Sequence, residues 1–291
     1  MDTFYAYVTA HDPLARFDSL LEVLRGYQTL PGSVQVFIYV DAAHIKDIQT
    51  LEDLLKPNLS GILVYCIAAN PCFTGFSLTW AHKQDLRRDV KAKKADFYIY
   101  SENDMVFGRP QFDYWVKYKP LLEPFNLEPG FCRYETHRGD KIPFDNYRVW
   151  QLNRPTLGVW GDRPYLVQTH LALSDPDVLG FVSLGNPYMG MMILDQHDAE
   201  VYIRSASSHP ELSYALTAHR NWPIADRSSM GLAFEELSFD QEHRRVVPVV
   251  ANGKRVKIPD YGLIEHKDTK YSELLASEQK SLITVDTMFE V

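Results

Sequence analysis

The sequence contains few cysteines, only three among 291 residues. Cys66, Cys72 and Cys132 match neither the paired-ligand spacing of a structural zinc site nor a disulfide framework. Cys66 lies in an apolar run and is expected to be a buried thiol. With 45% hydrophobic residues, the fold is expected to depend on a packed core and not on cross-links.

Glycine-rich phosphate loops are also missing. No Gly-x-Gly-x-x-Gly follows the first β-rich run, and no Gly-x-x-x-x-Gly-Lys-Ser/Thr occurs anywhere in the sequence. Such loops let backbone amides approach phosphate groups closely in dinucleotide-binding folds and P-loop enzymes. Their absence argues against both classes, and a bound metal becomes the expected means of neutralising a diphosphate.

The sequence shows no long apolar segment and no basic leader at its amino terminus. We therefore expect no membrane-spanning helix and no signal peptide, and we predict a cytoplasmic protein. The 30 basic and 38 acidic residues give a formal net charge of −8, which disfavours a broad basic surface for nucleic acid. A basic segment over residues 83–94 interleaves with Asp85 and Asp89, a pattern typical of a solvated helix.

The first hundred residues alternate between β-rich and amphipathic runs. The pattern predicts strands over residues 4–10, 34–40, 61–67 and 96–100, and helices over residues 14–27, 44–56 and 78–94. Such alternation predicts an α/β fold with a mostly parallel mixed sheet, flanked by helices and joined by right-handed crossovers.

We expect residues 1–291 to form one domain. Its nucleotide-binding half would span residues 1–108, and a less regular acceptor-side half would span residues 109–291. Residues 246–258 carry a β-hairpin signal near the carboxyl end, with Asn252-Gly253 suited to the turn.

The fourth predicted strand runs directly into the acidic triplet Glu102-Asn103-Asp104. On an extended backbone, side chains two residues apart point the same way, so the carboxylates of Glu102 and Asp104 can share one cation. Carboxylate oxygens suit Mg²⁺ or Mn²⁺, which keep coordination positions for substrate phosphates. Chance alone produces such triplets among 38 acidic residues, and the position after an apolar strand is what favours a metal site.

Two further polar residues end predicted strands. His11 follows the first strand and Asp41 follows the second. Ligands of α/β sheets bind beyond the carboxyl ends of the strands, so both residues are candidates for ligand binding. Asp41 is suited either to accept hydrogen bonds from a base or ribose or to cap the helix that follows.

These segments together resemble the nucleotide-binding half of the GT-A glycosyltransferases, in which an acidic motif of the DxD type ends a strand. The motif here is the variant Glu102-Asn103-Asp104. Residues 78–83, 100–105, 129–135 and 229–235 extend the resemblance over most of the chain. They are similar to a bacterial or viral branch of this superfamily that acts in the cytoplasm.

The resemblance implies an enzyme that moves a hexose or pentose from a nucleotide-diphosphate sugar to an acceptor hydroxyl, with Mn²⁺ or Mg²⁺ as cofactor. Glu102, Asp104 and His266 would bind the metal. The residues that would contact the donor are His11, Asp41, Trp80, His82, Lys83, Arg133 and Lys270. The expected acceptor is a saccharide, a lipid-linked glycan or a protein, and the net charge makes modified DNA a less favoured acceptor.

Two carboxylates are candidates for the base that deprotonates the acceptor. Glu135 lies in a strand-like run after the turn at Pro129-Gly130, and Glu235 lies beside an apolar patch. Trp160, Tyr188 and Trp222 are suited to stack on a sugar, although core packing is the more ordinary role for each.

Several alternatives remain open at this level. Trp80 is also suited to core packing, His266 to an ordinary structural position, and Glu235 to the surface of a helix. A nucleotide-binding module or an inactive relative would share the fold. A nucleotidyltransferase or metal phosphoesterase would use similar carboxylates for different bond-breaking chemistry.

Overall fold

The computed structural model describes residues 1–143, 178–184, 186–217, 222–238, 241–253, 255–273 and 284–286. The chain divides into two compact units. The first contains Met1–Arg109 and Gly190–Glu242, and the second contains Pro110–Met189 and His243–Val291. Residues 190–242, grouped above with the acceptor side, therefore fold together with the first hundred residues. Among the described residues, no helix has the length and apolar character needed to cross a membrane.

The first unit is built on a five-stranded sheet in the order β10-β4-β1-β2-β3. Its strands are β1 (Asp2–Ala10), β2 (Gly32–Val40), β3 (Ile62–Ala68), β4 (Phe97–Glu102) and β10 (Met191–Asp195). The first four are parallel, and β10 runs antiparallel to β4. Because β2 lies on one side of β1 and β4 on the other, the strand order reverses between β1 and β4, the position where such sheets bind ligands.

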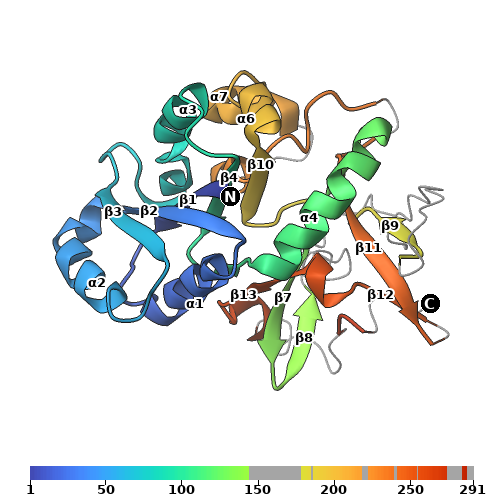
Figure 1. Ribbon diagram of the computed structural model, residues 1–291, viewed down its shortest axis with the longest axis horizontal. Helices are drawn as coiled ribbons and strands as arrows, with labels where there is room; N and C mark the ends of the chain where they lie inside the picture. The colour runs from blue at the N-terminus through green and yellow to red at the C-terminus, as the bar shows by residue number, and fades with distance from the viewer. Residues whose placement is uncertain are drawn as a thin grey trace. The chain divides into compact units, whose positions relative to one another are not determined.

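Helices cover both faces of this sheet (Figure 1). One face carries α1 (Phe17–Gln28) and α2 (Ile48–Leu55), and the other carries α3 (Lys83–Lys91) and α6 (Gln196–Tyr202). Neighbouring residues of β4 point to opposite faces. Tyr100 packs in one core cluster with Leu86 of α3, whereas the Ser101 hydroxyl lies 2.7 Å from the Tyr27 hydroxyl of α1. The predicted α/β sheet flanked by helices is thus confirmed.

Two of the predicted helices are divided in the structure. Residues 44–56 contain η1 (Ala42–Asp47) followed by α2, and the dihedral angles of His44 are non-helical. Residues 78–94 contain the end of η2 (Gly75–Trp80) followed by α3. The first unit is completed by β5 (Met105–Val106), η4 (Ala206–Ser208), α7 (Pro210–Thr217) and α8 (Ile224–Ser228).

The second unit contains a long helix and several short strands. Its elements are α4 (Arg109–Leu122), η3 (Glu123–Phe125), β6 (Glu128–Pro129), β7 (Cys132–His137), β8 (Asp140–Pro143), β9 (Gly180–Val182), β11 (Arg245–Asn252), β12 (Arg255–Lys257), η6 (Asp260–Gly262) and β13 (Leu263–His266). β7 pairs parallel with β13 and antiparallel with β8. β11 pairs antiparallel with β12 and β9 and parallel with β6.

The predicted carboxyl-terminal hairpin is confirmed by the pairing of β11 with β12, in which Asn252 lies opposite Arg255. Gly253, between these strands, has a φ of +63°, a conformation that favours glycine. The expectation for the cysteines is wrong at one position. Cys66 is only half-buried because β3 is an edge strand of its sheet, whereas Cys132 lies in the core of the second unit.

Candidate functional site

The acidic triplet lies where the sequence predicts it, at the carboxyl end of β4. Glu102 is the last residue of the strand and lies beside Thr9 of β1 in the sheet register. Asp104 follows in a turn, its side chain is buried, and the Arg16 guanidinium lies 3.5 Å from its Oδ2. The first unit thus balances this carboxylate with positive charge from its own chain.

A second carboxylate lies at the end of β2. Asp41 is 1% exposed and accepts hydrogen bonds from the N–H groups of Ala43 at 3.0 Å and Gly75 at 3.1 Å. His11 lies 2.9 Å away through Nδ1, which donates because the carboxylate is the acceptor. Burial alone would raise the pKa of the Asp41 carboxyl, but these three hydrogen bonds outweigh it and lower the pKa.

This arrangement gives Asp41 two roles within the first unit. It caps η1 through the Ala43 amide, as one of the two readings of the sequence predicted. It also orients the His11 ring through Nδ1, and the His11 side chain is 64% exposed. Polar side chains therefore line one edge of the sheet, where the parallel strands end. His11 follows β1, Asp41 follows β2, and Glu102 and Asp104 lie at the end of β4.

Trp80 and His82, predicted to contact the donor, lie inside the first unit. Trp80 is 2% exposed, and its Nε1–H donates to the Ile224 carbonyl at 2.8 Å. His82 is fully buried and stacks on Tyr100, with ring centroids 4.1 Å apart. Burial, and then the neighbouring Lys83, lower the pKa of His82 well below its usual value, which favours the neutral ring. These positions favour packing roles beneath the sheet edge.

Lys83 reaches inward from the first turn of α3. Its Nζ donates to the Tyr202 hydroxyl at 2.7 Å and to the Ser228 carbonyl, and it lies 5.3 Å from the centroid of the Tyr100 ring. Burial lowers the pKa of the Lys83 ammonium well below its usual value. The expectation of a solvated helix therefore fails at this lysine, whereas Arg88 and Lys91 of the same helix are exposed.

Arg133 of β7 is a buried cation in the second unit. It is 5% exposed, and its guanidinium lies over the Tyr188 ring at 4.2 Å from the centroid. Tyr188 thereby packs against a cation of its own unit. Lys270 is exposed, and its Nζ lies 4.8 Å from the centroid of the Tyr271 ring. Contact of Arg133 and Lys270 with a donor stays a prediction.

Glu135 lies two residues beyond Arg133 on the same face of β7 and is fully buried. Its Oε1 lies 2.8 Å from Nδ1 of His266 and accepts from the Tyr271 N–H at 3.3 Å. Its Oε2 accepts from the Ser272 N–H at 2.6 Å. Both oxygens thus bind donors of the second unit, and the catalytic-base role of Glu135 stays a prediction.

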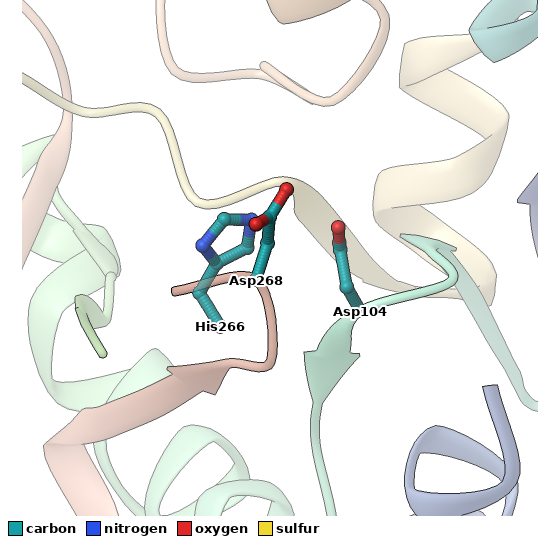
Figure 2. A group of neighbouring side chains, drawn as sticks. All are labelled: Asp104, His266 and Asp268. Atoms are coloured by element: carbon teal, nitrogen blue, oxygen red, sulfur yellow. The ribbon is translucent and has the colours of Figure 1, made fainter. Parts of the chain in front are cut away.

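Figure 2 shows side chains with metal-ligand chemistry at two strand ends: Asp104 of the first unit, and His266 and Asp268 of the second. Within the second unit, a ring nitrogen of His266 and a carboxylate oxygen of Asp268 lie within 4.8 Å of each other. The sequence analysis missed Asp268. Its signal was present, because His266 and Asp268 have the same spacing as Glu102 and Asp104.

The remaining candidates are held within their own units. Glu235 accepts from the Ser207 N–H at 2.7 Å and lies in a turn, so the alternative of a helix residue is wrong, while its base role stays a prediction. Trp222 is 9% exposed and packs near Phe234, with ring centroids 6.4 Å apart, which favours its packing role. Trp160 lies outside the described residues.

The comparison with known protein families finds no matching model, and the comparison with curated proteins finds no matching relative. The fold and the residue chemistry described above therefore carry the functional proposal.

Proposed function

We propose that this protein is a metal-dependent glycosyltransferase whose first unit is a nucleotide-binding unit of the GT-A type. The observation that carries the proposal is the position of Glu102 and Asp104 at the carboxyl end of β4. This strand lies next to β1, where the strand order of the sheet reverses, and ligands of α/β sheets bind at that reversal. This position supports the proposal that the acidic pair holds a metal-bound diphosphate.

The chemistry of the ligand set fits Mn²⁺ or Mg²⁺. Glu102 and Asp104 contribute carboxylates, and Arg16 lies beside Asp104 as a cationic partner from the same unit. We retain His266, which the resemblance assigned to the same metal, as a proposed further ligand. An imidazole among carboxylates favours Mn²⁺ over Mg²⁺, because Mg²⁺ prefers oxygen ligands alone.

A divalent cation held by Glu102 and Asp104 would supply positive charge to offset the charge that develops on the leaving diphosphate. The protein's own residues fix the donor. Asp41 holds His11 through Nδ1, and the Nε2 of the exposed neutral ring would accept a hydrogen bond from a ribose hydroxyl. In this proposal Trp80 and His82, both buried, support the sheet edge from the interior of the first unit.

The acceptor hydroxyl would attack the anomeric carbon of the donor sugar while the bond to the diphosphate breaks. We retain a saccharide, a lipid-linked glycan or a protein as the proposed acceptor, and a cytoplasmic location. A net charge of −8 gives modified DNA a lower rank among acceptors.

The test is release of nucleoside diphosphate from a panel of nucleotide sugars in the presence of Mn²⁺, Mg²⁺ or EDTA. We expect one donor to be hydrolysed only with metal, and the Asp104→Asn variant to lose this activity because it loses a negatively charged ligand. Asp96→Asn is the matched control. Asp96 lies just before β4 at its opposite end, where its carboxylate accepts from the Thr3 N–H, a role that an asparagine carbonyl can keep.

Each outcome of this experiment has a separate meaning. Metal-dependent activity that Asp96→Asn retains and Asp104→Asn loses supports the proposal. Release of pyrophosphate or inorganic phosphate instead would identify a nucleotidyltransferase or phosphoesterase. A folded protein that binds no sugar nucleotide, with or without metal, would contradict the proposed function.

A further inference from the structure

We propose that Glu135 is a positioning residue that fixes His266 for metal binding. The proposal rests on the function proposed above and concerns the second unit alone. It assigns to Glu135 a role different from the catalytic base that the sequence suggested. A positioning residue acts through another side chain, and in this case that side chain is the His266 imidazole.

The strand register brings the two side chains together. β13 pairs parallel with β7, with Ile264 opposite Arg133 and Glu265 opposite Tyr134. The next residue of each strand is His266 and Glu135, and their side chains lie 2.8 Å apart. Glu135 is fully buried and His266 is 6% exposed, so water does not compete strongly for this hydrogen bond.

The geometry selects one form of the imidazole. A carboxylate only accepts hydrogen bonds, so Nδ1 of His266 carries a hydrogen and donates it to Oε1 of Glu135. In the neutral ring, the lone pair then lies on Nε2. A histidine held in this way by a carboxylate is the usual arrangement at protein metal sites, because the partner fixes the ring orientation and makes the free nitrogen more basic.

The surroundings of Glu135 keep the carboxylate itself in place. The N–H groups of Tyr271 and Ser272 donate to its two oxygens from the segment that follows Asp268. Three donors from two segments therefore converge on one buried carboxylate. The same contacts connect β7 to both sides of Asp268, the other potential ligand of this unit.

Mn²⁺ binding to the whole protein tests the proposal, with isothermal titration calorimetry as the measurement. We expect Glu135→Ala to weaken Mn²⁺ binding by about 10- to 100-fold, the usual effect of removing such a partner. Glu135→Gln keeps an oxygen acceptor for His266 but loses the charge, and it should fall between the wild type and Glu135→Ala.

The matched control is Glu265→Gln. Glu265 lies directly before His266, and it accepts from the Thr136 hydroxyl on the exposed side of the strand. The Glu265→Gln substitution removes one carboxylate charge directly beside His266 without changing the partner of the imidazole. We expect Mn²⁺ affinity to be unchanged, and a loss equal to that of Glu135→Gln would assign the effect to charge alone and overturn the proposal.

A double-mutant cycle shows whether Glu135 acts through His266. Once His266→Ala has weakened the binding of Mn²⁺, adding Glu135→Ala should weaken it little further. Equal effects of Glu135→Ala in both backgrounds would overturn the proposal, because a merely structural role does not depend on the imidazole. If Glu135→Ala does not fold, ¹⁵N NMR of His266 in the metal-free wild type decides, and a hydrogen on Nε2 instead of Nδ1 in the neutral ring overturns the proposal.

Failure of this inference can be distinguished from failure of the proposed function. A wild type that binds no Mn²⁺ would contradict the metal-dependent function and the inference with it. A wild type that binds Mn²⁺, with loss of affinity in His266→Ala but none in Glu135→Ala, would contradict the role of Glu135 alone.

Discussion

Replacing Asp41 by asparagine should strongly destabilise the first unit. The carboxylate is 1% exposed and accepts three hydrogen bonds, from Ala43, Gly75 and His11. Asparagine keeps the size of the side chain but has one oxygen acceptor. If that oxygen stays with Gly75 and His11, the amide group faces the Ala43 N–H, and one donor–acceptor pair becomes a donor–donor pair.

The cost follows from this count of hydrogen bonds. Leaving one backbone donor unsatisfied costs about 1–3 kcal/mol, and removing the charge weakens each of the two remaining bonds by about 0.5–1 kcal/mol. The three changes together lower the free energy of unfolding by about 2–5 kcal/mol. Asp47→Asn is the control, because Asp47 pairs with His44 near the surface at 3.1 Å, and such pairs contribute less than about 1 kcal/mol.

Urea unfolding of both variants at neutral pH measures these differences, and a pH series tests their origin. The pKa of Asp41 is lowered in the folded state, so its stabilisation is present above the unfolded pKa of about 3.9 and is lost as the pH falls through the lower folded value. The difference in free energy of unfolding between the wild type and Asp41→Asn should therefore become smaller below about pH 4. A loss no larger than that of Asp47→Asn, or a gap that persists in acid, would refute this account of Asp41.

Two further predictions concern the interior of the first unit. Lys83→Met should flatten the rise of wild-type stability with pH below the unfolded lysine pKa of about 10.4, because burial lowers the folded pKa of Lys83 and the unfolded chain then binds the extra proton, with a slope of at most about 1.4 kcal/mol per pH unit; equal slopes in urea unfolding of the two proteins would contradict this. Tyr27→Phe and Ser101→Ala should each lower the free energy of unfolding by about 1–3 kcal/mol. The two buried hydroxyls lie 2.7 Å apart, and each substitution leaves the remaining one without this partner. The double variant should cost less than the sum of the two, and strict additivity in thermal unfolding would show that the two hydroxyls do not interact.

The sequence alone was sufficient for the parallel part of the first sheet. β1, β2, β3 and β4 were predicted because apolar runs and turn residues alternate over short distances, and local spacing determines which residues form each strand. The position of the acidic pair followed from the same spacing, since Glu102 ends β4 and Asp104 lies two residues further along the chain. The helix-capping role of Asp41 could also be predicted from local sequence, because the Ala43 N–H that donates to its carboxylate is only two residues away.

The contacts that define the rest of the candidate site join residues far apart in the chain. β10 joins β4 across about ninety residues of sequence, so no local pattern assigned residues 190–242 to the first unit. Glu135 and His266 are likewise 131 residues apart. Composition and spacing marked both as polar residues near strands, but only the pairing of β7 with β13 made one the hydrogen-bond acceptor of the other.

Lys83 shows the same division within a single helix. The helical period places Lys83, Leu86 and Val90 on one face, so the sequence contained the signal that this lysine lies on the apolar side. Its charge nevertheless predicted a solvated position, because an isolated buried ammonium is costly. The Tyr202 hydroxyl and the Ser228 carbonyl offset that cost, and both come from segments more than a hundred residues away. The sequence determined the four parallel strands and the acidic strand end, because both depend on local spacing. Tertiary structure decided which polar groups have partners, because a partner exists only after distant segments pack.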